Sequence, residues 1–130
     1  MIRAVVDTNT LVSGFGWRGA PGAVVDAVLD GRLGVVTSPQ LLDELARVLR
    51  YPKLAPAFPD PARIVTLISA IAETVQPTQQ LHIVADEADN RVLEAALTGE
   101  VDLIVTGDRE LRAFDGIDIL TSTEALTRLS

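Results

Sequence analysis

Two aspartates follow largely apolar segments, at points where a folding chain gains little from an acid. Asp7 ends the run Ile2–Val6, and Asp108 ends a second run, Leu103–Gly107. In an open α/β sheet, ligands bind outside the carboxyl ends of the strands, so both carboxylates are expected at one edge of the sheet. Carboxylates that converge repel each other unless a cation lies among them, and hard divalent cations prefer oxygen ligands. The pair therefore suggests metal-dependent chemistry.

A third acid, Glu44, is distinguished from its neighbour Asp43 by helical geometry. A helix is predicted over residues 38–50, and at about 100° per residue five of its side chains form one apolar stripe. These are Leu41, Leu42, Leu45, Val48 and Leu49. Asp43 falls nearly opposite the stripe, where solvated charge is expected, whereas Glu44 falls at its edge and could enter a cleft. The alternative for Glu44 is an ordinary surface pair with Arg47, one turn further on.

A fourth acid, Asp89, lies in the first turn of a helix predicted over residues 86–98. First-turn acids are commonly explained by capping and by the helix dipole, and Asp86 can supply the cap. Asp89 instead falls within the apolar stripe that faces the sheet, formed by Val92, Leu93 and Ala96. A lone carboxylate buried there would be unstable unless a cation or several hydrogen-bond donors met it. This placement favours a functional acid.

The four acids predict a site that is both catalytic and metal-binding, with the ligands Asp7, Glu44, Asp89 and Asp108. An all-oxygen site favours Mg²⁺ or Mn²⁺ over zinc, and the chain has no cysteine and a single histidine. Such ions activate water and stabilise the charge on a departing oxygen, so hydrolysis of a phosphodiester would need no protein nucleophile. Asn9 and Thr106 are expected to support the carboxylates through short polar side chains.

Basic and aromatic residues near these motifs are candidates for substrate contact. Arg18 and Arg109, with Arg112 beside them, could meet a phosphate, although each is also readily explained as a solvated surface charge. Trp17 could stack on an unpaired base, but packing against its own domain or a second subunit is the simpler expectation. His82 is expected to be structural.

The order of these motifs resembles that of the PIN-domain ribonuclease family, and most closely its branch of toxins from bacterial type II toxin–antitoxin modules. The matching segments are Val-Val-Asp-Thr-Asn at residues 5–9, Asp-x-x-Asp-Asn at 86–90 and Val-Thr-Gly-Asp at 105–108. The resemblance covers essentially the whole chain. It implies that the four acids are the family's acidic quartet and that RNA is the substrate. Glu87 and Ala88 stand where many relatives have proline and aspartate, which leaves the quartet intact.

Length and composition predict one domain and exclude several classes of protein. At 130 residues, the chain is expected to form a single PIN-like nuclease domain over 1–130. No apolar stretch approaches the roughly 20 residues that span a bilayer, and the apolar start is too short for a signal peptide. With no cysteine, a cytoplasmic protein is expected. A net charge of −7 argues against coating nucleic acid by counterion release, but not against a phosphodiesterase.

Strand and helix patterns alternate along the chain. Strands are predicted over 2–6, 33–36, 82–85, 101–106 and 117–120, and helices over 20–29, 38–50, 60–75 and 86–98. Thr121-x-x-Glu124 is a capping box for a last helix, and the proline-rich segment 52–61 is predicted to be a loop. This alternation indicates an α/β fold, a three-layer sandwich with a parallel sheet of four to five strands covered by helices on both faces.

Three functions remain open at this level. The leading one is an endoribonuclease restrained by a cognate antitoxin, and we expect a homodimer. A phosphatase with an aspartyl nucleophile would also place an acid such as Asp7 after its first strand. It usually needs a second acid two residues later, where this chain has Asn9. A catalytically silent PIN-like binding module is the third, and the intact set of four acids counts against it.

Overall fold

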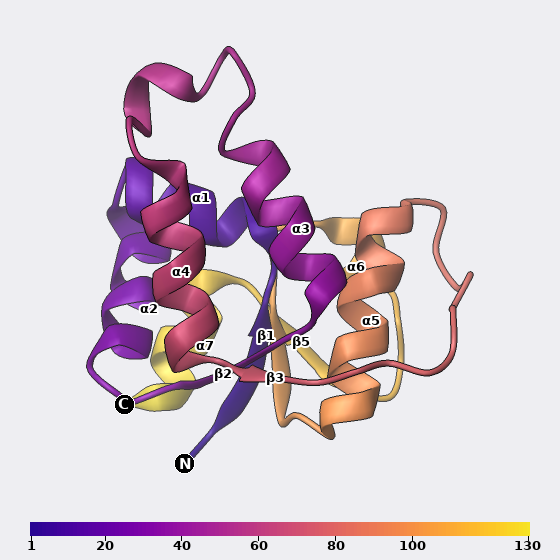
Figure 1. Cartoon of the computed structure of the whole chain (residues 1–130). Coiled ribbons are helices and arrows are strands. Elements are labelled where there is room, and N and C mark those ends of the chain that lie inside the picture. The colour runs from indigo at the N-terminus through magenta and orange to yellow at the C-terminus, as the bar shows by residue number, and fades with distance from the viewer.

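The computed structural model describes all residues from 1 to 130 and contains a five-stranded parallel sheet (Figure 1). Its strands are β1 (Arg3–Val6), β2 (Gly34–Thr37), β3 (Glu73–Thr74), β4 (Leu103–Val105) and β5 (Asp118–Leu120). They are ordered β3-β2-β1-β4-β5, so that the first strand lies in the centre. Parallel pairing brings the carboxyl ends of all strands to the same edge.

Helices cover both faces of the sheet, which confirms the predicted three-layer α/β sandwich. They are α1 (Thr8–Gly16), α2 (Gly19–Leu29), α3 (Pro39–Val48), α4 (Pro61–Ile71), α5 (Glu87–Gly99), α6 (Arg109–Arg112) and α7 (Ser122–Leu129), with a 3-10 turn at Ala55–Ala57. Figure 1 shows α1, α2, α4 and α7 on one side of the sheet and α5 and α6 on the other. No helix is both long enough and apolar enough to span a membrane.

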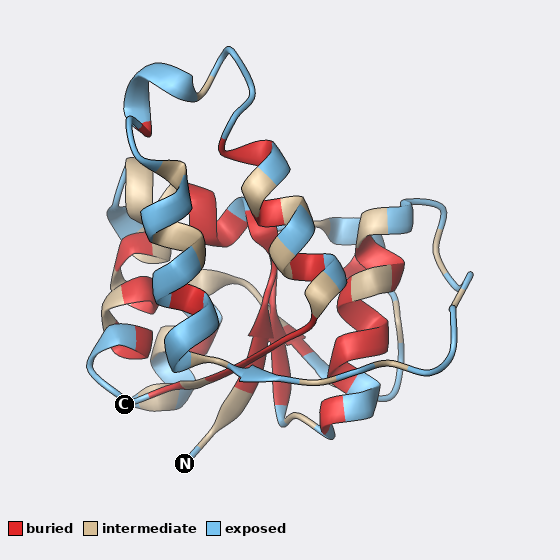
Figure 2. Ribbon diagram, in the orientation of Figure 1, coloured by how far each residue is buried: buried red, intermediate tan, exposed pale blue.

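The central strand β1 is buried on both faces, so its side chains alternate between two hydrophobic cores. Ala4 and Val6 pack into the larger core, beneath α1, α2 and α4, while Val5 packs into the smaller core beneath α5. Figure 2 shows the strands as the buried centre of the molecule. This double burial explains why the segment is almost continuously apolar rather than alternating with polar residues.

Five helices begin beside this carboxyl edge, each capped by a short polar side chain. The caps are Asp7 for α1, Ser38 for α3, Asp86 for α5, Asp108 for α6 and Thr121 for α7, and each side chain accepts a hydrogen bond from a first-turn N–H group. The predicted capping box at Thr121 is also present. The fold therefore concentrates carboxylates and helix N-termini at one edge.

One helix was not predicted from the sequence, and another ends earlier than predicted. Residues Thr8–Gly16 form α1, which the pattern did not predict because the segment is rich in Thr, Ser and Gly, residues with low helix propensity. The helix that begins at Pro61 ends at Ile71 rather than continuing to 75. The next residues, Glu73–Thr74, pair with β2 as the edge strand β3.

The strand predicted over residues 82–85 is absent, and the prediction was wrong. The backbone of this segment is held instead by the side chains of α5. Asn90 Oδ1 accepts hydrogen bonds from Ile83 N–H and Val84 N–H, and Asn90 Nδ2 donates to Val84 O. Leu81 N–H donates to the buried Glu94 carboxylate at 2.7 Å. Because these side chains satisfy the backbone, the segment needs no strand partner.

Candidate metal centre

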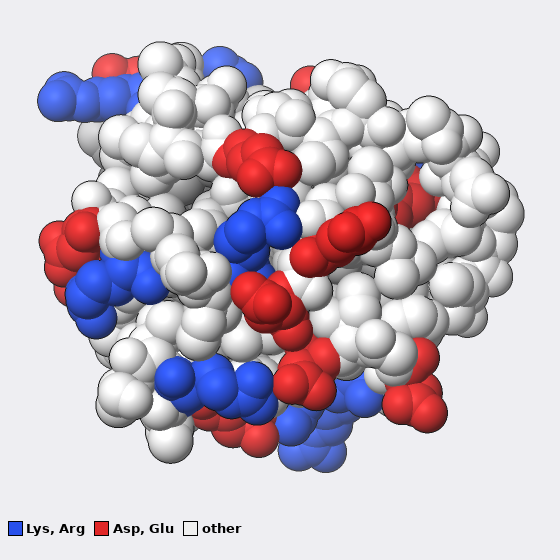
Figure 3. Space-filling view, turned by 90° about the horizontal axis from the view of Figure 1, so that it is seen from below, with Lys and Arg blue, Asp and Glu red and all other residues white.

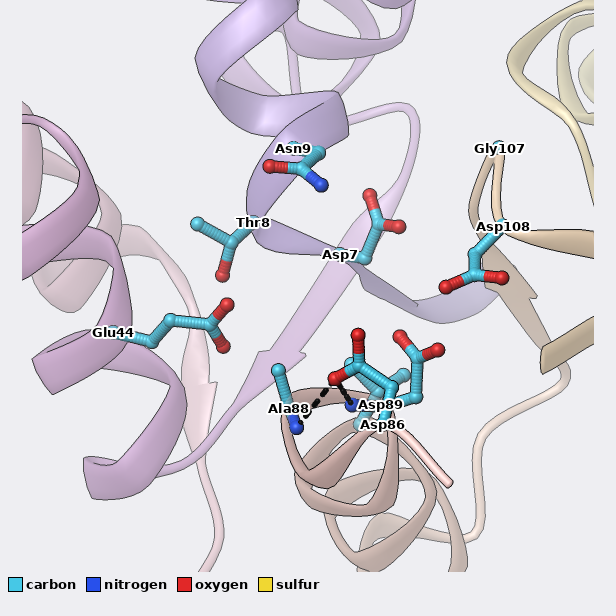
Figure 4. A pocket seen from close by; sticks show the side chains of 10 residues that line it. Asp7, Thr8, Asn9, Glu44, Asp86, Ala88, Asp89, Gly107 and Asp108 are labelled. Atoms are coloured by element: carbon cyan, nitrogen blue, oxygen red, sulfur yellow. Dashed lines mark hydrogen bonds between the residues drawn. The ribbon is translucent and has the colours of Figure 1, made fainter. Parts of the chain in front are cut away.

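An acidic cleft of about 340 Å³ opens at the carboxyl edge of the sheet. Its lining residues are Asp7, Thr8, Asn9, Glu44, Asp86, Ala88, Asp89, Val92, Gly107 and Asp108. Figure 4 shows Glu44 reaching in from α3, Asp86 and Asp89 standing on α5, and Asp108 on the far side. The four acids selected from the sequence thus converge, a fifth acid joins them, and no Lys or Arg is among the lining residues.

Asp7 is buried and held in one orientation by both of its oxygens. Oδ1 accepts a hydrogen bond from Thr10 N–H at 2.8 Å, and Oδ2 accepts one from the hydroxyl of Thr106. The Thr106 hydroxyl in turn accepts a hydrogen bond from Asp108 N–H at 3.0 Å. One threonine therefore connects the ends of the neighbouring strands β1 and β4 and fixes two acids relative to each other.

Asp89 and Asp108 lie close enough for each carboxyl group to shift the pKa of the other. Burial, contact with Asp108 and the neighbouring acids raise the pKa of Asp89 to about 8. The hydrogen bond from Asp89 lowers the pKa of Asp108 below its ordinary value. Asp89 is only 7% exposed, and its Oδ2 is buried without a hydrogen-bond partner. This oxygen lacks the positive partner that a buried carboxylate requires.

Asp86 is the acid that the sequence pattern assigned only to capping. Its Oδ1 accepts hydrogen bonds from Ala88 N–H and Asp89 N–H, which is the expected cap. One oxygen each from Asp86, Asp89 and Asp108 nevertheless lie within 4.8 Å of one another. A signal for this was present in the sequence, since residues three apart lie on the same side of a helix. The cap therefore adds a fifth acidic side chain to the cleft.

Glu44 faces Asp7 across the cleft, as its position at the edge of the apolar stripe predicted. Its side chain is half-buried, whereas that of Asp43 is exposed. Burial raises the pKa of Glu44, while a hydrogen bond with the Thr8 side chain and the charge of Arg47 oppose this rise. The alternative, a surface pair with Arg47, is therefore not the main influence, because the charge of Arg47 has a smaller effect than burial. The dominant influence on the pKa of Glu44 is the removal of its carboxyl group from water.

These residues fit a hard divalent cation. The donors are carboxylate oxygens, with no histidine or thiolate among them, and this set favours Mg²⁺ or Mn²⁺. The orphaned Asp89 oxygen and the raised pKa of that carboxyl are typical of clustered acids that have no positive partner. A cation would supply the charge that no basic side chain supplies.

The basic candidates lie outside this cleft. Arg18 forms a salt bridge with Asp26 at 2.6 Å and also donates to Gly14 O, while Arg109 is exposed at the first residue of α6. Trp17 packs edge-on against Phe58, with ring centroids 5.8 Å apart, and remains 59% exposed. The expected packing within its own domain is therefore present. His82 is exposed, 3.5 Å from Glu87.

Elsewhere the charges are mixed rather than acidic. Figure 3 shows the face seen from below in Figure 1, where blue and red residues alternate. At the amino ends of β1 and β5, Arg3 pairs with Glu73 at 2.9 Å and Arg128 with Asp118 at 3.2 Å. Because these arginines have acidic partners of their own, they do not form a free basic patch on this face.

Comparison of the sequence with known proteins identifies one family, and comparison of the structure identifies one fold. A family model described as PIN domain matches residues 3–110. An uncharacterized protein of Methanocaldococcus jannaschii is 29% identical over 114 residues, which cover 85% of this chain and 73% of the relative.

Three solved structures share the fold. VapBC2 from Rickettsia felis, bound to a DNA fragment from their promoter, has a TM-score of 0.63 at 12% identity, covering 91% of this chain and 97% of that one. PAE2754 from Pyrobaculum aerophilum has a TM-score of 0.62 at 20% identity, covering 98% and 89%. FitAcB from Neisseria gonorrhoeae has a TM-score of 0.60 at 14% identity, covering 92% and 98%.

Proposed function

Because the chain belongs to the PIN-domain family, we propose that it is a metal-dependent endoribonuclease that hydrolyses phosphodiester bonds of RNA. Residues 1–130 would form one nuclease domain. The observation that carries the proposal is the cleft itself, in which five carboxylates converge with no basic residue lining it. Such a site repels a phosphodiester unless a cation is bound, so binding of the ion and of the substrate would be linked.

Asp7, Glu44, Asp89 and Asp108 would hold Mg²⁺ or Mn²⁺. When bound, such a cation supplies Lewis-acid activation of water and stabilises negative charge on the phosphate. Asp7 would keep a fixed direction because Thr10 and Thr106 occupy both of its oxygens. Because the pKa of Asp89 is raised, binding of the cation would be linked to release of the proton from this carboxyl group. The amide of Asn9, which lines the same cleft, can donate to a phosphate oxygen.

The phosphatase alternative is disfavoured by the residue two positions after Asp7. That chemistry usually needs a second acid there, and this chain has Asn9. A catalytically silent binding module is also disfavoured. A buried carboxylate without a partner is unfavourable for folding, and a module that only binds would gain nothing from it.

The proposal is tested by metal removal. Purified protein is expected to cleave single-stranded RNA in Mg²⁺ or Mn²⁺, to lose this activity in chelator and to regain it when the ion is restored. Gel analysis of end-labelled RNA measures the rates. Asp7→Asn, purified in parallel, controls for contaminating ribonuclease, because it removes the charge of a proposed ligand while preserving side-chain size. Cleavage that persists without divalent ions, or at equal rates in Asp7→Asn, would disprove the mechanism.

We further propose that the protein is the toxin of a toxin–antitoxin pair and acts in the cytoplasm. The motif order described above supports this, as does the shared fold with VapBC2, which is described on a DNA fragment from the promoter of its own components. A cognate antitoxin that places a basic side chain among the carboxylates would replace the cation. This mode of inhibition suits the cleft because no positively charged residue lines it, so a basic side chain from the antitoxin would meet only carboxylates.

A homodimer is expected in solution at tens of micromolar. The exposed face of α4 presents Leu67 and Ile71, which are 37% and 44% exposed, and apolar contacts of this kind are enriched at dimer interfaces. Light scattering coupled to size exclusion measures the mass. Leu67→Glu combined with Ile71→Glu is expected to give a monomer of unchanged fold by circular dichroism. A wild-type protein that is monomeric throughout this range would exclude the dimer.

A further inference from the structure

A second groove, of about 330 Å³, adjoins the acidic cleft. The two share Asn9 and Gly107 as lining residues, so they lie side by side on the surface. Figure 4 places both shared residues on the side of Asp7 away from α5. No ionisable side chain lines the second groove. Its polar side chains are the amide of Asn9 and five hydroxyl groups, on Thr10, Ser13, Thr121, Ser122 and Thr123.

Gly107 stands at the junction, and the fold gives no reason for a glycine there. Its backbone is not in the left-handed region that favours glycine, in contrast to Gly19, Gly31 and Gly116. A Cβ built at Gly107 would have no atom within 4 Å, whereas at Gly14 it would meet Pro21 O at 2.6 Å. Neither conformation nor packing therefore excludes a side chain. A side chain at this position would stand at the boundary between the cleft and the groove, since Gly107 lines both.

The groove has the chemistry to bind a ribose–phosphate backbone through neutral donors. Hydroxyl groups donate to phosphate oxygens and exchange hydrogen bonds with a ribose 2′-hydroxyl. The groove also contains the start of α7, where the N–H groups of Ser122 and Thr123 belong to the first turn and have no partner within the helix. The five carboxylates of the neighbouring cleft repel an RNA strand, whereas no negatively charged side chain lines this groove.

We propose that the substrate strand enters the cleft over Gly107, with the nucleotide next to the scissile phosphate bound in this hydroxyl-lined groove. The inference rests on the proposed ribonuclease function and adds to it a backbone-binding subsite that uses no arginine or lysine. Recognition by hydroxyls and amides follows the sugar–phosphate chain rather than the bases, so the subsite tolerates many sequences. It also releases few counterions on binding.

Two substitutions test the subsite, with a third as a matched control. Gly107→Leu blocks the junction, and Ser122→Leu fills the groove at the first position of α7. Thr127→Leu makes the same kind of change on an exposed face of α7, outside the groove. For a short single-stranded RNA, the first two are expected to raise KM about tenfold, the loss of one or two hydrogen bonds, while Thr127→Leu leaves KM unchanged. Melting temperatures verify that all three variants fold.

RNA binding separates failure of the subsite from failure of the proposed function. Fluorescence anisotropy with labelled RNA, in Ca²⁺ to limit turnover, is expected to show weaker binding by Ser122→Leu at every salt concentration, with the same salt slope as wild type. This result supports the subsite even if the wild-type protein cleaves no RNA. Equal binding by Ser122→Leu and wild type, a smaller salt slope in the variant, or no RNA binding by the wild type would overturn it.

Discussion

Asp89→Asn is expected to abolish RNA cleavage and, at the same time, to raise the melting temperature of the metal-free protein. Loss of a proposed metal ligand should reduce the cleavage rate by at least about 100-fold, because even outer partners of metal ligands contribute about 10–100-fold. The stabilisation arises because the introduced amide would resemble the protonated form of the acid, with an N–H group that can donate to Asp108. The substitution removes a buried charge whose Oδ2 has no partner.

The stabilisation should depend on pH in a defined direction. The pKa of Asp89 rises from 3.8 to about 8 on folding, so between these values the unfolded chain loses its proton while the folded chain keeps it. The contribution of Asp89 to the stability of the folded wild-type protein is therefore fully present below about pH 4 and is lost as pH rises to about 8. The gain in melting temperature of Asp89→Asn should be smallest near pH 4 and reach roughly 5–10 °C at pH 8.

Differential scanning fluorimetry in chelator, across this pH range, measures the effect beside the cleavage assay. Asp115→Asn removes an exposed carboxylate outside the cleft and serves as the control, with no pH-dependent gain expected. Saturating Mn²⁺ should reverse the order of stability, because the ion binds the folded wild-type protein more tightly than the variant. A gain in Asp89→Asn that is the same at every pH would show that its buried charge is not the cause.

Glu44→Gln and Asp43→Asn are expected to differ by more than about 100-fold in cleavage, although the two acids are adjacent in sequence. Glu44 lines the cleft from α3 and is removed from water, which raises its pKa, whereas Asp43 is exposed. Glu44→Gln should lose activity and bind Mn²⁺ more weakly by isothermal titration calorimetry. Asp43→Asn should retain both within about twofold. The reverse result would mean that α3 presents a different face to the site.

The strands β1, β2, β4 and β5 and the convergence of acids were predictable because they depend on local pattern and on a general property of parallel sheets. Val5 and Ile104 lie in apolar runs that only burial explains, and the acids that end those runs must share an edge. The helical-wheel argument worked for Glu44 because α3 has a well-defined apolar stripe. In each case, the spacing of apolar residues along the chain indicated which way a neighbouring acid would point.

The features that could not be predicted depend on partners distant in sequence. The helix α1 has weak intrinsic propensity and is stabilised by packing of Leu11 and Val12 into the core. The segment before α5 has strand-forming residues, yet the Asn90 side chain satisfies its backbone. Asp86 already had a sufficient explanation as a cap, and only the folded chain shows its carboxylate beside Asp108.

The central position of β1 has a consequence for how the protein is made. The hydroxyl that orients Asp7 comes from Thr106, which is 99 residues later in the chain, and Asp108 lies two residues further on. During synthesis, β1 emerges well before its neighbour β4, so the acidic cluster cannot assemble on a chain that stops short of β4. A nascent ribonuclease of this design would remain inactive toward the messenger and the ribosome that produce it until the segment with Thr106 and Asp108 has been made.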